Sequence, residues 1–151
     1  MSTVRPDNLK AALDAKLAAA MSQLVDLREA EQARVAHLNP REIVRSFLLY
    51  ARGVCAIVET FGKSQAGHLQ FNAWYGQWSQ ELSGVDRALW ARLRDNRVEQ
   101  GHGQDPALLA LDSAVAARPS AGSEMCTGWL QLVQRLAADF LRDYARFLPE
   151  T

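Results

Sequence analysis

The stretch NPREIVRSFLLYARGVCAIVETFG, residues 39–62, decides the fold of this chain. Asn39 can cap a helix, Pro40 suits the first helical position, and Glu42 can complete a capping box. Apolar side chains then recur every three or four residues in two adjacent stripes, which is the period of an α-helix. A face this wide predicts a central helix, over about residues 40–62, that packs on more than one neighbour and ends at Gly62. The stripes are Ile43, Phe47, Tyr50, Val54, Ile57 and Phe61, and Val44, Leu48, Ala51, Cys55 and Val58.

The narrow remaining side of this central helix carries Arg45, Arg52 and Glu59, which are seven residues apart. Two interpretations of these charges stay open. They can face solvent, as most charged helix faces do, or they can border a cleft.

The residues before this stretch predict one long helix from about 6 to 38. Pro6 fits its first turn, and leucines then recur at spacings of three and four until the pattern lapses at Glu31. A helix side rich in charges is typically solvated and joined by local ion pairs, and we expect the same here. The charges concerned are Asp26, Arg28, Glu29, Glu31 and Arg34.

The residues after this stretch predict further helices. One begins at His68, a surface or capping histidine, and others cover about 85–101 and 106–117, the latter capped by Asp105. Ser123 is expected to cap the last helix, which Pro149 ends. Its predicted buried side carries Cys126, Trp129, Val133, Leu136, Phe140, Tyr144 and Phe147. We find no strand-like alternation, so the chain is predicted to be one all-α domain, residues 1–151. The predicted architecture is a bundle of five or six helices, in which the long first helix precedes the main part of the domain, residues about 40–148.

Composition limits the possible functions. The chain has 151 residues, of which 17 are basic and 17 acidic, so any nucleic-acid binding must rely on a local patch. Cys55 and Cys126 sit in apolar helical patterns, which favours reduced core thiols over a disulfide. No apolar run reaches the ~20 residues of a membrane span, and nothing resembles a signal peptide. We therefore expect a cytoplasmic protein without membrane contact.

Several kinds of site are disfavoured by the motifs. His37, His68 and His102 are far apart in the sequence, and Glu99-x-x-His102 is a single copy of a motif that a di-metal bundle site needs twice. Phosphate loops, nucleophile elbows and dinucleotide fingerprints are absent from the sequence. We expect neither a metal nor another cofactor.

Residues 87–103 carry the densest set of chemically capable side chains, including Arg97 and His102. Cleavage of RNA by its own 2′-hydroxyl requires proton transfer, which a histidine can perform, and stabilisation of negative charge, which an arginine can provide. Positions five apart on an ideal helix differ by about 140° in direction, so a helix end near Gly101 would help both side chains reach one ligand. The alternative is a surface arginine and a histidine that interacts with the helix dipole.

The sequence resembles the central part of HEPN-type proteins over about residues 41–104. The similarity rests on residues 71–75 (FNAWY), Leu82, Asp86, and the run Leu93-Arg94-Asp95-x-Arg97-x4-His102-Gly103, with the helix that opens at Arg41. Val98 follows the motif arginine, where the family usually has a polar residue.

This resemblance implies an α-helical bundle that forms a homodimer and brings two R-x(4–6)-H motifs together. Such a site binds RNA or acts as a metal-independent endoribonuclease, and many family members belong to toxin–antitoxin or phage-defence systems. By this similarity Arg97 and His102 are the catalytic candidates. Arg94, Asp95 and Asn96 are the candidates for substrate binding, and an antitoxin or another protein is a possible partner.

A second functional class is an interaction module without catalysis. Trp and Tyr are enriched in interface hot spots, and Trp74 and Trp78 share an aromatic helix face with three further residues. Such a face most often belongs to the core, and base stacking is a third interpretation. Burial of the two tryptophans discriminates between these interpretations. The five residues of the aromatic face are Phe71, Trp74, Tyr75, Trp78 and Leu82.

Overall fold

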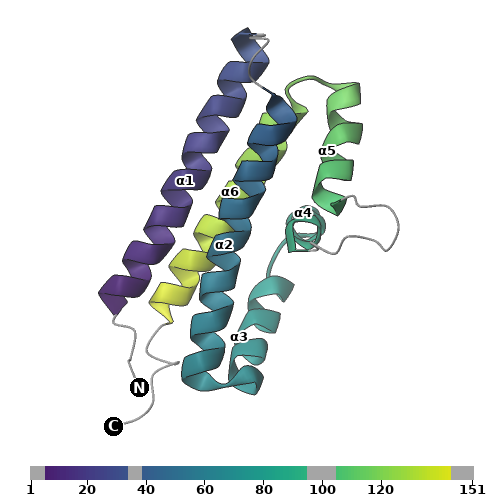
Figure 1. Cartoon of the computed structure of the whole chain (residues 1–151). Coiled ribbons are helices and arrows are strands. Elements are labelled where there is room, and N and C mark those ends of the chain that lie inside the picture. The colour runs from purple at the N-terminus through teal and green to yellow at the C-terminus, as the bar shows by residue number, and fades with distance from the viewer. Residues whose placement is uncertain (1–5, 34–38, 95–104, 144–151) are drawn as a thin grey trace.

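In the computed structural model, the described residues, which are 6–33, 39–94 and 105–143, form six α-helices and no strand (Figure 1). The predicted all-α class and helix number are confirmed. None of these six helices combines the length and the apolar character needed to cross a lipid bilayer. The helices are α1 (Pro6–Ala33), α2 (Pro40–Ala66), α3 (His68–Gln80), α4 (Gly84–Arg94), α5 (Pro106–Ala117) and α6 (Ala121–Arg142).

Three long helices make up the body of the bundle. α1 packs along α2, and α6 packs against both of them. Figure 1 shows that α2 and α6 run in the same direction, while α1 runs the opposite way. The chain leaves α2 at one end of the bundle and returns to the start of α6 at the other end through α3, α4 and α5 (Figure 1). The three short helices therefore take the place of a fourth long one.

α2 is the central helix that its two apolar stripes predict, because it contacts all five other helices. The Asn39 side chain accepts a hydrogen bond from the backbone N–H of Arg41 at 3.0 Å, and Pro40 begins the helix, as predicted. Both free cysteines, Cys55 and Cys126, are buried in the core. The buried residues of α2 are Val44, Phe47, Leu48, Ala51, Val54, Cys55, Val58, Phe61 and Gly62.

The predicted end of the central helix at Gly62 is wrong, because α2 continues to Ala66. Gly67, with a φ of 88°, follows the helix, and its N–H donates to the carbonyl of Lys63 at 3.0 Å. Gly62 has a packing role instead, because a Cβ added there would lie 2.2 Å from Cδ1 of Phe71. Glycine at this position lets α3 approach α2 closely.

The predicted solvated side of α1 is wrong at Glu31, which is half-buried against α6, while Arg28 stays exposed and also reaches α6. Glu31 accepts hydrogen bonds from the backbone N–H of Ser123 at 3.0 Å and from its hydroxyl at 2.6 Å. Arg28 donates to the hydroxyl of Thr127 at 2.9 Å. Ser123 is also not the cap of α6, since the helix begins at Ala121. The carboxylate of Glu31 instead satisfies a free N–H in the first turn of α6.

The aromatic face of α3 belongs to the core. Trp78 is 4% exposed, and its indole N–H donates to Asp139 at 2.9 Å. Trp74 is half-buried, and its indole N–H donates to Asp143 at 2.8 Å. Asp139 lies in the last turn of α6, and Asp143 directly follows the helix. α3 therefore packs on α6 through two similar hydrogen bonds about one turn apart. The interaction surface considered around these tryptophans therefore loses the support of Trp78, which is internal, while Trp74 is only half-buried.

The remaining boundaries agree with the sequence where they can be compared. α5 spans Pro106–Ala117 as predicted, and Asp105 caps it by accepting from the N–H of Ala107 at 2.9 Å. His68 is exposed at the start of α3. The predicted continuations over 34–38, 95–101 and 144–149 lie outside the described residues. The buried side of α6 is confirmed for Cys126, Trp129, Val133, Leu136 and Phe140.

Candidate functional site

A cluster of charged side chains lies where α2 meets the end of α4 and the start of α5. Its centre is Arg52, halfway along α2. The Nε of Arg52 donates to the backbone carbonyl of Leu93 at 2.7 Å. Its two terminal nitrogens donate to the two carboxylate oxygens of Asp105 at 2.5 and 2.8 Å. One guanidinium thus joins the last turn of α4 to the residue that caps α5.

Asp105 has two functions in this cluster, since it caps α5 and pairs with Arg52. Partial burial by itself would raise the pKa of Asp105, because a charged carboxylate is less stable away from water. The hydrogen bonds from Arg52 and from the N–H of Ala107 outweigh this effect and hold the pKa below its ordinary value. The carboxylate is therefore ionised at neutral pH and keeps both of its contacts.

Arg94 is the second cation of the cluster, and it is held in place. It donates to Glu59 at 3.2 Å, and its guanidinium lies over the ring of Tyr75, 5.5 Å from the centroid. Glu59 also accepts from Lys63 at 2.6 Å, and this bond is the main reason why the pKa of Glu59 is lowered. Arg94 is therefore oriented before any ligand arrives, and its side chain remains 34% exposed.

The inner side of the cluster consists of neutral groups. Burial raises the pKa of the Cys55 thiol to about 11, although the nearby Arg94 opposes this effect. Burial also raises the pKa of Tyr75, whose hydroxyl accepts a hydrogen bond from the indole of Trp90 at 2.5 Å. Cys55 and Tyr75 are therefore protonated at neutral pH and provide no nucleophile.

Of the residues predicted for the site, the structure describes Arg94 alone. Arg97, His102, Asp95 and Asn96 lie outside the described residues, as do Val98 and the single Glu99-x-x-His102 motif. Among the residues that the structure does describe, no group of three or more histidine, cysteine or carboxylate side chains is placed to hold a metal ion.

Two residues of the cluster were only partly anticipated from the sequence. Arg52 and Glu59 were expected either to face solvent or to border a cleft. The structure half-buries them, with 20% and 34% of their side chains exposed, against α4 and α5. Arg45, on the same side of α2, is 51% exposed and pairs with Glu42, three residues earlier, at 3.3 Å. The sequence feature that pointed to Arg52 and Glu59 was the seven-residue spacing of charges on an otherwise apolar helix.

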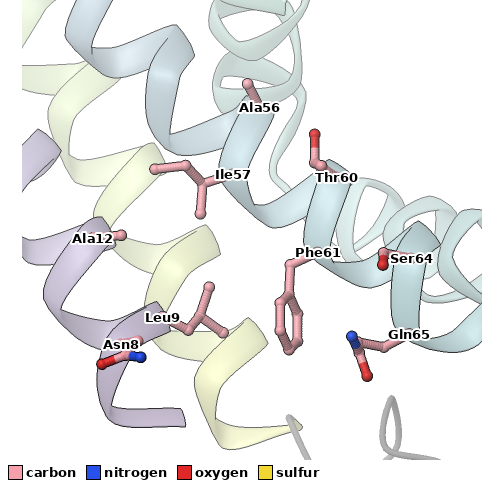
Figure 2. A pocket seen from close by; sticks show the side chains of 9 residues that line it. All are labelled: Asn8, Leu9, Ala12, Ala56, Ile57, Thr60, Phe61, Ser64 and Gln65. Carbon is pink, nitrogen blue, oxygen red and sulfur yellow. The ribbon is translucent and has the colours of Figure 1, made fainter. Parts of the chain in front are cut away.

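A separate pocket of about 390 Å³ lies between α1 and α2, toward the end of the bundle where α1 begins (Figure 2). Leu9, Ile57 and Phe61 line it with apolar surface, while amides and hydroxyls occupy its edge. None of its lining residues titrates near neutral pH, so the pocket offers no acid–base chemistry. Its lining consists of Asn8, Leu9, Ala12, Ala56, Ile57, Thr60, Phe61, Ser64 and Gln65.

Comparisons with known proteins do not add a family to these observations. No protein-family model, no curated protein and no solved structure matches the chain.

Proposed function

We propose that this chain is a HEPN-like protein that binds RNA as a homodimer and cleaves it without a metal ion. The observation that supports this function best is the position of Arg52. Its guanidinium contacts Leu93 and Asp105, which lie on either side of residues 95–104. Those ten residues carry Arg97 and His102. An all-α bundle of six helices is also compatible with the fold that the resemblance implies.

The proposed reaction uses two histidines, one from each subunit, as the base and the acid. The ring of His102 accepts the proton of an RNA 2′-hydroxyl, whose oxygen then attacks the adjacent phosphorus. The bond from phosphorus to the 5′-oxygen breaks, and a 2′,3′-cyclic phosphate forms. His102 of the partner subunit donates a proton to the leaving oxygen. Arg97 binds the phosphate and stabilises the negative charge that develops on it.

Substrate binding is assigned to the residues just before the motif. Arg94 supplies a fixed positive charge, because Glu59 and the ring of Tyr75 hold its guanidinium while a third of the side chain stays exposed. Asp95 and Asn96 orient neighbouring groups in the proposed site. Since the chain has no net charge, this local arrangement of arginines has to provide the attraction for RNA.

The resemblance also suggests a biological setting. Many HEPN-type proteins act in toxin–antitoxin or phage-defence systems, so we propose the cytoplasm as location and an antitoxin-like protein as a further partner. A nuclease of this kind would need such a partner to restrain it.

The test is an RNase assay of the purified protein with a single-stranded RNA that contains all four bases, in the presence of EDTA. Wild type is expected to cleave, and His102→Ala and Arg97→Ala are expected to lose at least about 100-fold in rate. His68→Ala is the matched control, because His68 is exposed on α3 and should behave as wild type. Equal cleavage by wild type and His102→Ala, or none by either, refutes the proposed reaction.

A further inference from the structure

Another pocket, of about 400 Å³, lies at the end of the bundle where α1 ends and α2 and α6 begin (Figure 1). This volume is within the range of small-molecule binding sites. Apart from one carboxylate, the lining consists of aliphatic side chains, two prolines and a glycine. The lining residues are Leu27, Glu31, Pro40, Val44, Leu111, Val115, Pro119 and Gly122.

Glu31 is the charged residue of this lining, and its carboxylate is only partly used. It accepts hydrogen bonds from the backbone N–H of Ser123 at 3.0 Å and from the Ser123 hydroxyl at 2.6 Å. A carboxylate has about four positions at which it can accept a hydrogen bond. About half of the accepting capacity of Glu31 is therefore left for a ligand.

The cations around the pocket do not neutralise Glu31. Among the described residues, Glu31 forms no ion pair, and three arginines that adjoin the lining in the sequence contact other groups. The start of α6 offsets about half a unit of the negative charge. The pocket therefore still attracts a cation. The three arginine contacts are Arg28 with the hydroxyl of Thr127, Arg41 with Asp112, and Arg118 with Glu124.

The other groups of the pocket suit the apolar part of a ligand. None of the eight described lining residues has a side chain that donates a hydrogen bond, and Pro40 and Pro119 also lack a backbone N–H. Gly122 keeps space open beside the carboxylate. A Cβ added there would lie 3.1 Å from Oε1 of Glu31 and 3.6 Å from Cγ2 of Val115. The pocket thus combines one anionic acceptor with an aliphatic wall.

We infer that this pocket binds a small primary amine with a compact apolar body. The ammonium group donates charge-assisted hydrogen bonds to the free acceptor positions of Glu31. The hydrocarbon part lies against Leu27, Leu111 and Val115, where it is removed from water. This inference does not rest on the proposed function, because the pocket shares no residue with the charged cluster around Arg52.

The test is a titration of the full chain, followed by ¹H–¹⁵N NMR, with 2-phenylethylamine and with hexylamine. The neutral counterparts are 2-phenylethanol and 1-hexanol. Glu31→Gln removes the charge and keeps an oxygen that can accept from Ser123. Gly122→Ala fills part of the pocket, and alanine favours the helix. The matched control is Glu29→Gln, because Glu29 is exposed on α1. Melting curves establish that each variant is folded.

We expect at least one amine to bind wild type with a Kd below about 1 mM, and about tenfold more tightly than its alcohol, which is the gain from a charge-assisted hydrogen bond. The largest NMR shifts should fall on Leu111, Val115 and Gly122. Glu31→Gln should lose the preference for the amine, Gly122→Ala should bind both ligands more weakly, and Glu29→Gln should match wild type.

Four results would overturn the inference. They are the absence of binding by both amines, equal binding of each amine and its alcohol, a preference that survives in Glu31→Gln, and shifts confined to other parts of the bundle. Sedimentation tests another occupant. A wild-type oligomer that binds no amine and dissociates in Glu31→Gln would show that a second copy of the chain fills the pocket, which also contradicts an amine site.

Discussion

The close approach of α3 to α2 at Gly62 gives the sharpest prediction about stability. In Gly62→Ala the new Cβ would lie 2.2 Å from Cδ1 and 2.7 Å from Cε1 of Phe71, whereas an ordinary contact is 3.4 to 4 Å. The ring cannot retreat freely, because it stacks on Tyr75 at 6.1 Å and packs edge-on against Phe140 at 6.4 Å. Overpacking of a core typically costs about 1–3 kcal/mol, and we expect the upper end here.

The intrinsic preference of helices for alanine offsets this loss by about 1 kcal/mol, so the net destabilisation should be about 2 kcal/mol. For a chain of this size that lowers the melting temperature by roughly 4–8 °C. Gly76→Ala is the matched control, because Gly76 lies inside α3 and a Cβ there meets nothing within 4 Å. It should stabilise the protein by up to about 1 kcal/mol. Urea denaturation of both variants measures these changes, and a Gly62→Ala protein as stable as wild type would refute the packing argument.

Three further predictions concern polar and buried groups. Glu31→Ala removes the contact that satisfies the start of α6, and it should lower the free energy of unfolding by about 1–2 kcal/mol in urea. Glu29→Ala on the exposed side should change it by less than about 0.5 kcal/mol, and equal effects would contradict the capping role. The lowered pKa of Asp105 means that its pairing with Arg52 stabilises the fold above the ordinary aspartate pKa and is lost as pH falls through the folded value. Asp105→Asn should therefore lose stability at neutral pH and converge with wild type in acid, and a constant difference in melting temperature would argue against it. Because burial raises the pKa of Cys55 to about 11, its thiol should resist alkylation at neutral pH until the protein unfolds, and rapid labelling of the native protein would count against this.

Local signals in the sequence were sufficient for most of the fold. Asn39-Pro40 and Asp105-Pro106 each combine a capping side chain with the residue best suited to the first helical turn, and both helices begin there. The wide apolar face of α2 correctly indicated a helix with several neighbours. These features depend on nearby residues and on helical periodicity, so they can be recognised without knowing which helices pack together.

The errors came from contacts between different helices. Gly62 looked like a helix end because glycine commonly follows helices, but its role is the close approach of Phe71 from α3. In the sequence, Glu31 looked like a lapse in an apolar pattern. In the structure, its carboxylate accepts a hydrogen bond from Ser123 of α6, which is 92 residues away along the chain. A single sequence gives no pairing information of this kind.

For the candidate site, too, the sequence indicated local features but not the contacts between helices. The sequence drew attention to the charges of α2 through their spacing, but it could not show that Arg52 would turn toward α4 and α5 and Arg45 toward solvent. That difference depends on the position of Asp105, which is 53 residues away. Arg94 was identified as a cation near the motif, whereas its restraint by Glu59 and Tyr75 required the packed structure.

The most direct test of the central claim is the identity of the 3′ end that the protein leaves on cleaved RNA. Mass spectrometry of the products, formed in EDTA, should show a 2′,3′-cyclic phosphate, because the 2′-hydroxyl is the proposed nucleophile. The same RNA with a 2′-deoxy nucleotide at the cleaved position should remain intact. Products that end in a 3′-hydroxyl, or cleavage that persists at the 2′-deoxy position, would contradict the account.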